Sequence, residues 1–529
     1  MKRSTATNSA APRNRPLDNN GTTLSGWCSQ ANPMKTFILH TVLVLTLASS
    51  TLAQPKAPAK NPTEADYYPM VGFDTPKETV MEAGGLEMMD DGKLAIGTRR
   101  GEIWMVENPA ENDPAKMKWK LWASGLHEIL GLAKRDGWLY ICQRPEITRA
   151  KDLDGDGRAD LFETVTDKWE ISGDYHEYNF STKFDKEGNI WVVLCLTGSF
   201  NSNVPYRGWC VRVSHDGKMI PTASGIRSPG GIGFGPDGDV FYCDNQGPWN
   251  GTSNFKHIKV NSFQSHPGGF KWYDLPEVKA AMGPRPEEPK TKSRWHIEAA
   301  RLPKFVPPPN MVPHGKLGNS ASGVEYDDTG KFGPFKGQMF ISDQSFSQVN
   351  RVFLEKINGQ YQSAVFAFRS GFGSGNVPML FDRKDGSLYV GGTNRGWGSR
   401  GNKQGAVDRI YWNGKIPFEV HEMRIKPDGF ELTFTQPIDK TTVGDIKSYS
   451  LKAYTYIMQS DYGSPEVDHT TPVIKSIKVA DDGKSARLVI EGLAIGSIHE
   501  LAMPGIRSAD GLPLLHNTGY YTLWNLPKE

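Results

Sequence analysis

The amino-acid sequence predicts an all-β protein, a six-bladed β-propeller followed by a C-terminal immunoglobulin-like β-sandwich. Composition is the first observation behind this prediction. The 529 residues include 56 glycines and 36 prolines, and 11% are aromatic, a mixture that suits short strands joined by tight turns. The second observation is a strand-turn-strand unit that recurs along most of the chain. The third is the loss of that unit after about residue 416.

The recurring unit is an alternating apolar run, an Asp- or Gly-bearing turn and a second apolar run. Examples are LEMMDDGKLAIGT (86–98) and STKFDKEGNIWVVLC (181–195). Six turn glycines mark the units: Gly92, Gly137, Gly188, Gly238, Gly330 and Gly386. Most gaps are about 50 residues, which suits a four-stranded blade. A proline-rich insertion at about 274–313 explains the one long gap; it could instead hide a seventh blade.

A β-sandwich would also fit the turn signals alone. Recurrence of the whole unit at blade-like spacing favours a propeller over residues 65–416. Residues 417–529 alternate with period two in segments such as FELTFTQPID and SIKVADDGKSARLVIEGL, which predicts the immunoglobulin-like sandwich.

The N-terminal region predicts export. Residues 34–53 have a lysine, an apolar run and the small-residue site Thr51-Leu52-Ala53, so we expect signal-peptide cleavage near Ala53. The run is too short to span a bilayer, and no lipidated cysteine follows it. We therefore predict a secreted or periplasmic protein with a linker at 54–64 and no membrane span after cleavage. Residues 1–33 are either a disordered or misassigned upstream segment or part of an unusually long signal region.

Charge and cysteine usage narrow the function classes. Lys and Arg (61) nearly balance Asp and Glu (59), and without a basic cluster we expect no nucleic-acid partner. Four cysteines follow the predicted cleavage site: Cys142, Cys195, Cys210 and Cys243. They are expected to be buried apolar residues, and Cys195–Cys210 is the one candidate disulfide. The chain has no Cys-x-x-Cys-His motif for covalent haem.

Strand direction predicts which residues share one mouth of the propeller. In a four-stranded up-and-down blade, the segments that follow each second strand and those that enter each first strand lie on the same face. These segments are polar and aromatic, which favours a ligand-binding mouth. They are Arg99-Arg100, His127, Gln143-Arg144, Asp174-Tyr175-His176, Arg227, Asp244 to Trp249, His314, Asn319-Ser320, Asp343-Gln344-Ser345 and Thr393 to Trp397.

An acidic loop, DLDGDGRADLFE (152–163), has oxygen-bearing residues at the spacing of an EF-hand calcium loop. The alternative is a solvated acidic turn. Its flanks are strand-like, and counting strands places it between the third and fourth strands of a blade, away from the mouth. The calcium is therefore expected to be structural. The predicted ligands are Asp152, Asp154, Asp156, Arg158, Asp160 and Glu163.

His176 in HEYNFSTKFDKEGNIW and Arg227 in RSPGGIGFGPDG resemble the glucose/sorbosone dehydrogenase-like propellers, soluble quinoproteins that bind pyrroloquinoline quinone (PQQ) at one mouth. The resemblance covers about 80–413. It implies that His176 is the base that takes a hydroxyl proton and that Arg227 polarises the quinone. The candidate cofactor-binding residues are Arg227, Asn245, Gln246, Trp249, Asn394, Arg395 and Trp397. Ser228, where that family commonly has Asn, is a departure.

Segments such as DNQGPW (244–249) and PHGKLGNSASG (313–323) look closer to uncharacterised exported dehydrogenase-like propellers of planctomycete and verrucomicrobial bacteria. Three functions follow. The favoured one is a PQQ-type dehydrogenase of sugars or other alcohols, which would need a separate electron acceptor such as a cytochrome. The alternatives are a non-catalytic propeller that binds carbohydrate or protein, and a polysaccharide hydrolase or lyase using carboxylates such as Asp244 and Asp343.

Overall fold

The computed structural model describes residues 61–198, 200, 201 and 203–528. The predicted upstream segment, the signal peptide and the first part of the linker lie outside the described residues. Within the described ranges, every helix is too short or too polar to cross a membrane. Strands dominate these ranges, so the predicted all-β class is confirmed.

The first three sheets follow one another along the chain, and each pairs its strands in sequence order. Their strands are β2 (Ala83–Met88), β3 (Leu94–Thr98), β4 (Ile103–Glu107) and β5 (Lys118–Ala123); β6 (Ile129–Arg135), β7 (Trp138–Gln143), β8 (Ile147–Lys151) and β9 (Leu161–Thr166); and β10 (Asn179–Phe184), β11 (Asn189–Leu194), β12 (Trp209–Ser214) and β13 (Met219–Ser224), to which β17 (Ser262–Phe263) adds in parallel.

Three further sheets complete the series. Their strands are β14 (Pro229–Phe234), β15 (Val240–Asp244), β16 (Ser253–Ile258) and β19 (Asn310–Val312); β20 (Ala321–Tyr326), β21 (Met339–Asp343), β22 (Gln348–Ile357) and β23 (Gln360–Ser370); and β24 (Asn376–Phe381), β25 (Leu388–Thr393), β26 (Gly405–Ile410) and β1 (Met70–Gly72). The last sheet joins both ends of the series, because β1 pairs with β26.

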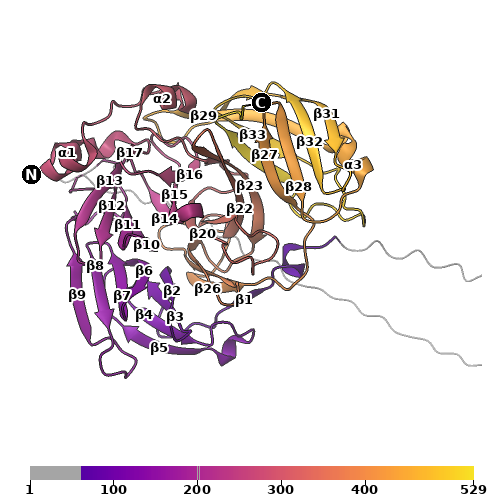
Figure 1. Cartoon of the computed structure of the whole chain (residues 1–529). Helices are drawn as coiled ribbons and strands as arrows, with labels where there is room; N and C mark the ends of the chain where they lie inside the picture. Colours follow the sequence, from indigo (N-terminus) through magenta and orange to yellow (C-terminus); the bar gives the residue numbers. More distant parts are fainter. Residues whose placement is uncertain (1–60, 199, 202, 529) are drawn as a thin grey trace, which may run out of the picture. The chain divides into compact units, whose positions relative to one another are not determined.

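These sheets form a closed ring around their first strands (Figure 1). The first strand of each sheet contacts the first strand of the next, and β24 contacts β2 to close the circle. Glycines permit this approach: a Cβ on Gly84 would lie 2.1 Å from the Ile129 carbonyl oxygen, and one on Gly230 would lie 2.4 Å from the Ala321 carbonyl oxygen. A ring of radially arranged sheets is the architecture of a β-propeller, as the repeat predicts.

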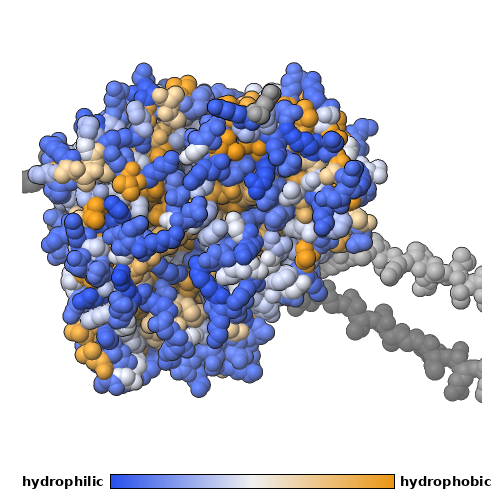
Figure 2. Space-filling view, viewed as in Figure 1, coloured by the Kyte–Doolittle hydropathy of each residue, from blue (hydrophilic) through white to orange (hydrophobic). Residues whose placement is uncertain are grey.

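The hairpin between the first two strands of a blade explains the recurring turn glycine. Gly188 joins β10 to β11 with a φ of +83°, a left-handed conformation that glycine adopts without steric cost. β11 (NIWVVL) is buried along its whole length, as expected for a strand packed on both faces. Hydrophilic residues dominate the face shown in Figure 2. Apolar strands such as β11 lie in the interior.

A two-layered sandwich follows the ring. One layer contains β27 (Val420–Lys426), β28 (Gly429–Phe434), β32 (Ser485–Glu491) and β31 (Val473–Val479). The other contains β29 (Ser450–Met458), β33 (Ser497–Ala502) and β34 (Thr518–Leu523), with β30 (Glu466–Thr470) pairing with β29. A core that includes Phe430, Leu488 and Tyr521 fills the space between them. The short helix α3 (Lys440–Gly444) and the 3₁₀ turn η5 (Ile446–Ser448) connect β28 to β29.

The second layer of the sandwich is continuous with the ring. β34 pairs with β23, with Ala364 opposite Tyr521, so one sheet runs from β20 through β23 into β34, β33 and β29. Phe366 of β23 belongs to the sandwich core. The sandwich therefore extends one blade, although its sequence gives no sign of that pairing.

The predicted insertion forms short elements and contributes to two sheets. It contains α1 (Pro276–Met282), β18 (Ser293–Arg294), α2 (Trp295–Arg301) and β19, and it begins at the end of η4 (Pro267–Asp274). β19 is the outermost strand of the fourth sheet, while β18 pairs with β29. The remaining 3₁₀ turns are η1 (Glu64–Asp66), η2 (Pro114–Lys116) and η3 (Pro236–Gly238).

A charged cluster links the start of the described residues to the sandwich. His516 Nδ1 lies 2.6 Å from Glu419 Oε1, and its Nε2 lies 3.1 Å from Glu64 Oε1. Glu64 also pairs with Arg369 at 3.3 Å and accepts from the Ser370 N–H. Burial alone would lower the pKa of His516, but the two carboxylates raise it overall to about 9.

This cluster predicts a loss of stability at alkaline pH. A histidine whose folded pKa is raised stabilises the protein fully below its ordinary pKa, and the contribution is lost as pH rises through about 9. We expect a loss of about 3 kcal/mol in the free energy of unfolding across that window. Urea unfolding of wild type and His516→Gln at several pH values measures it. An equal pH dependence of both proteins in this window would contradict the assignment.

Candidate functional site

One end of the ring contains a cavity of about 610 Å³, here called the mouth. Its lining comes from the links that enter first strands and the loops that leave second strands. The polar and aromatic lining residues include Arg99, Tyr175, His176, Tyr178, Phe200, Arg227, Ser228, Asn245, Gln246, His314, Asn319, Ser320, Gln344, Ser345, Thr393, Arg395, Trp397 and Tyr462. None of the described lining residues is an aspartate or a glutamate.

His176 precedes β10 and is only 6% exposed. Its Nδ1 lies 3.1 Å from the Leu196 carbonyl oxygen, which can only accept a hydrogen bond. Nδ1 therefore carries the proton of the neutral ring, and Nε2, 3.3 Å from Ser228 Oγ, keeps its lone pair. Burial and the nearby Arg227 lower the pKa of His176. The ring is thus a neutral base at physiological pH.

Arg227 lies in the link between β13 and β14 and is 2% exposed. Its Nη1 donates to the Asn245 carbonyl oxygen at 3.1 Å, and its guanidinium carbon lies 4.0 Å from the centre of the Phe200 ring. Its buried Nε has no hydrogen-bond partner among the described residues, and neither has Asn245 Oδ1. Buried polar atoms are usually satisfied. These two therefore mark a place where a bound ligand would supply partners.

A buried ion pair holds the backbone at Arg227. Asp244, at the end of β15, accepts hydrogen bonds from the Ser228 N–H at 2.7 Å and the Arg227 N–H at 3.3 Å. Its partner is Lys256 of β16, whose Nζ lies 3.1 Å away, and both side chains are fully buried. Burial alone would raise the pKa of Asp244, but the Lys256 ammonium and the Ser228 N–H lower it overall. Asp244 is therefore an anion that positions the Arg227 link.

One wall of the mouth carries Arg99 and Arg395, which belong to a network of arginines and glutamates. Glu82 pairs with Arg395 at 2.6 Å and with Arg100 at 2.7 Å, and Glu128 pairs with Arg99 and with Arg144 at 3.5 Å. Four guanidinium groups thus share two carboxylates. The network has an excess of positive charge, which favours an anionic group in the mouth.

The predicted cofactor-binding residues divide into two groups. Asn245, Gln246, Arg395 and Trp397 line the mouth together with Arg227. Trp249 and Asn394 are not among its lining residues. Trp249 packs partly buried against the interior core. The Asn394 side chain accepts from the Gly375 N–H before β24 and donates to the Gly401 carbonyl oxygen within its own loop.

Four aromatic residues of the mouth were not predicted, and one of them, Phe180, lies in β10. Phe200 lies in the loop after β11 with its ring 5.3 Å from that of His176. The ring centre of Tyr178 lies 5.1 Å from the guanidinium carbon of Arg99 and 5.4 Å from that of Arg144. Tyr462 comes from the loop between β29 and β30 in the sandwich. Hydrophobic periodicity and turn motifs in the sequence do not predict which distant segments contact each other. The one available sequence signal was the position of Tyr178, two residues after His176 in the polar link that enters β10.

The carboxylates proposed for a hydrolase lie beneath the mouth. Asp244 is engaged by Lys256 and the Arg227 link, as described above. Asp343 is fully buried and accepts from the N–H groups of Asn319 and Ser320 at 2.9 and 2.8 Å. Both side chains position backbone, so the hydrolase or lyase interpretation of these two residues is wrong.

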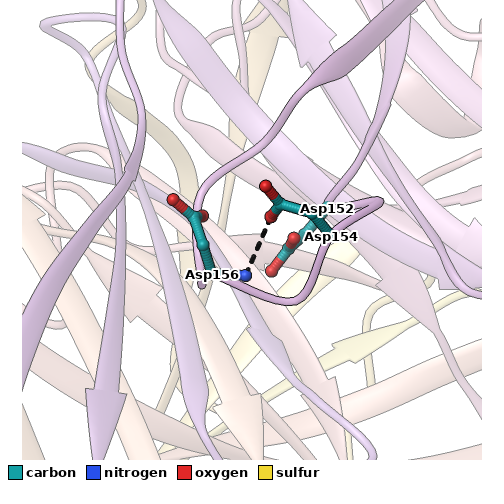
Figure 3. A group of neighbouring side chains, drawn as sticks. All are labelled: Asp152, Asp154 and Asp156. Carbon is teal, nitrogen blue, oxygen red and sulfur yellow. Dashed lines mark hydrogen bonds between the residues drawn. The ribbon is translucent and has the colours of Figure 1, made fainter.

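The acidic loop joins β8 to β9, the third and fourth strands of one sheet (Figure 3). Asp152, Asp154 and Asp156 each offer an oxygen within 4.8 Å of the others. Asp152 accepts from the Gly155 and Gly157 N–H groups, and Asp154 from the Asp156 N–H. Asp152 and Gly157 of the loop line a groove together with Asp91 and Gly137, which lie in the turns between the first and second strands of two sheets. No described residue of 152–163 lines the mouth.

The other predicted metal ligands, Arg158, Asp160 and Glu163, make hydrogen bonds or ion pairs of their own. Glu163 lies in β9 and pairs with Arg149 at 2.5 Å, Asp160 accepts from the Leu153 N–H, and the Arg158 N–H donates to Asp156. The twelfth position of an EF-hand loop normally supplies a bidentate carboxylate. Here the regular β8–β9 register directs that residue to its cross-strand neighbour Arg149 instead.

The candidate disulfide is not formed. All four described cysteines are buried free thiols. Cys210 in β12 is opposite Val193, and Cys195 lies beyond the end of β11 with its Sγ 3.3 Å from His176 Nδ1. The register of β11 and β12 therefore keeps the two thiols from facing each other.

No protein-family model and no curated protein matches the chain. Among solved structures, an oxidoreductase from Thermus thermophilus described as a glucose dehydrogenase is 18% identical, with a TM-score of 0.46, and 64% of this chain and 98% of that chain are covered. The PQQ-bound aldose sugar dehydrogenase of Streptomyces coelicolor is 14% identical, with a TM-score of 0.43 and coverages of 66% and 99%.

The PQQ domain of pyranose dehydrogenase from Coprinopsis cinerea is 11% identical, with a TM-score of 0.44 and coverages of 65% and 97%. All three are similar to this chain at low identity, so the function proposed below rests on the geometry of the mouth.

Proposed function

We propose that this chain is a six-bladed propeller dehydrogenase that oxidises a hydroxyl group of a sugar or other alcohol with a PQQ-type cofactor held in the mouth. One observation carries the proposal: a neutral buried histidine with an unprotonated Nε2 and a buried arginine with an unpartnered Nε line the same cavity. A base and a fixed cation side by side are what the oxidation of a carbinol requires.

The residues of the mouth suit a flat acidic quinone. PQQ carries carboxylates and an ortho-quinone, so it needs cationic and hydrogen-bonding partners. Arg227, Asn245, Gln246 and Arg395 would hold it. The unpartnered Arg227 Nε and Asn245 Oδ1 would gain partners, and the positive wall would balance its charge. When bound, the quinone would accept the hydride from the carbinol carbon.

The chain itself would handle the proton. His176 Nε2 takes the hydroxyl proton while its Nδ1–H remains bonded to the Leu196 carbonyl, which orients the ring and stabilises the charged form. Ser228 Oγ, next to Nε2, orients the hydroxyl group. Arg227, held by Asp244, supplies positive charge where negative charge develops. A separate acceptor such as a cytochrome would take the two electrons. The chain, exported as its N-terminus predicts, would meet the sugar and this acceptor outside the cytoplasm.

Titration of the cofactor onto the protein tests this proposal. We expect PQQ to bind at micromolar concentration with a change in its absorbance spectrum. Arg227→Met should weaken binding roughly 10-fold or more, as expected for the loss of a charge-assisted hydrogen bond worth about 1.5–3 kcal/mol. Arg212→Met, which removes an arginine of β12 outside the mouth, is the control. No binding of PQQ to the wild-type protein at micromolar concentration would contradict the proposal.

We propose a separate structural calcium at the acidic loop, held by Asp152, Asp154 and Asp156. Their adjacent carboxylates repel one another unless a cation lies among them. The double variant Asp154→Ala/Asp156→Ala is expected to melt at a lower temperature than wild type in calcium, with a loss of about 2–3 kcal/mol when calcium is 100-fold above its Kd. A chelator should lower the Tm of wild type only.

The matched control is Asp481→Ala/Asp482→Ala, which removes two exposed carboxylates from a turn of the sandwich. It should respond to calcium and chelator as wild type does. A wild-type Tm that is independent of both would contradict the calcium proposal without affecting the dehydrogenase proposal.

A further inference from the structure

Three exposed aromatic side chains surround the mouth. Tyr175, Trp397 and Tyr462 are 59%, 55% and 61% exposed, and all three line the cavity. They come from the link before β10, the loop after β25 and the β29–β30 loop of the sandwich. Leaving large rings in water forgoes the free energy of burying them. Three such rings around one cavity are therefore the signature of a binding surface.

The contribution of the sandwich is held firmly in place. The Trp249 N–H donates to the Gln459 carbonyl oxygen at 2.7 Å, and the Ser464 N–H donates to the Gly251 carbonyl oxygen at 3.0 Å. A Cβ on Gly251 would lie 2.8 Å from the Ile457 carbonyl oxygen, so the two loops are in close contact. Tyr462 thus occupies a fixed position at the edge of the propeller mouth.

Tyr462 reaches the reactive pair from outside. Its ring centre lies 5.2 Å from the Arg227 guanidinium carbon and 6.0 Å from the Phe200 ring centre. Tyr175 lies beside the base, with its ring centre 5.7 Å from that of His176. Aromatic rings therefore extend from Arg227 and His176 outward to solvent. A sugar unit bound at His176 would have neighbouring units over these exposed faces.

We propose that Tyr462, with Tyr175 and Trp397, forms a platform for additional sugar units, so that the enzyme acts on oligosaccharide ends in preference to free monosaccharides. This inference rests on the proposed dehydrogenase function. It makes Tyr462 a specificity-determining residue supplied by the C-terminal sandwich. The mouth would then combine a base and a cation with an aromatic surface for neighbouring sugar units.

A length series tests the platform. The holoenzyme reconstituted with PQQ is assayed by dye reduction on cello-, xylo- and galacturonate oligosaccharides of increasing length. We expect kcat/KM to rise from one to three units in at least one series. Tyr462→Ala should lower the trisaccharide-to-monosaccharide ratio roughly 3- to 10-fold, the range for one aromatic contact. Tyr462→Phe should retain the ratio, as should Phe162→Ala, which removes an exposed ring of β9 outside the mouth.

Equilibrium binding of the same oligosaccharides, measured by calorimetry, separates the two proposals because it needs no turnover. Length-dependent binding that Tyr462→Ala weakens, with no oxidation of any sugar, would overturn the dehydrogenase and support the platform. Oxidation without length preference in every series would overturn the platform and leave the dehydrogenase. A length preference unchanged in Tyr462→Ala, or a mouth that binds a protein and no oligosaccharide, would also overturn it.

Discussion

Replacing His176 with glutamine is expected to lower kcat for sugar oxidation by roughly 10²- to 10⁴-fold, the usual contribution of a positioned general base. Glutamine can still donate to the Leu196 carbonyl oxygen that His176 Nδ1 contacts, but it has no basic nitrogen for the hydroxyl proton. PQQ affinity should change much less, because Arg227 and the arginine wall provide the charge. Steady-state dye reduction and cofactor titration measure the two effects separately.

The pH profile distinguishes a base from a structural histidine. Because the pKa of His176 is lowered by burial, the wild-type rate should fall on the acid side only below the ordinary histidine range, as the ring becomes protonated. That acid limb should disappear in His176→Gln. His215→Gln, at an exposed turn after β12, should retain the wild-type rate and profile. A His176→Gln enzyme within a factor of three of wild type would contradict the assigned role.

Replacing Lys256 with methionine is expected to destabilise the protein by about 3–5 kcal/mol, as for one partner of a buried ion pair. The Lys256 ammonium also lies within hydrogen-bond distance of Asn250 Oδ1, the Gln264 carbonyl and Ser265 Oγ, so its loss removes the countercharge of Asp244 and one donor from each of these acceptors. Urea unfolding measures the change. Because Asp244 positions the Arg227 link, PQQ binding should weaken even under conditions where the variant is folded.

The matched control is Lys93→Met, which removes one partner of the exposed pair with Asp91. Exposed pairs contribute about 0–1 kcal/mol, so this variant should unfold close to wild type. A Lys256→Met protein within about 1 kcal/mol of wild type would show that Asp244 is not held as a buried anion, and would remove the proposed support for Arg227.

Much of the architecture could be predicted because it repeats. The turn glycines and alternating apolar runs predicted each blade hairpin, and strand direction alone brought His176, Arg227 and Arg395 to one end of the ring. The continuation of β23 into β34 could not be predicted. Strand pairing between segments about 160 residues apart leaves no local pattern, since every strand of either sheet alternates in the same way.

Strand direction also predicted part of the site. Residues that leave a second strand at its end, such as Asn245 and Arg395, line the mouth. Trp249 does not, because its left-handed backbone, with a φ of +60°, turns the loop back toward the core. Tyr462 was missed because its position depends on how the sandwich packs. The roles of Asp244 and Asp343 were misread because burial, which decides them, is not visible in a motif.

The central claim is that the mouth holds a quinone next to a working base, and anaerobic reduction of the bound cofactor tests it most directly. Holoenzyme with one equivalent of PQQ is titrated with sugar while the quinone absorbance is followed. We predict that one equivalent of an oxidisable sugar bleaches the absorbance in wild type and that His176→Gln reacts at least 100-fold more slowly, within the range for a general base. An oxidised spectrum that no sugar or oligosaccharide changes would contradict it.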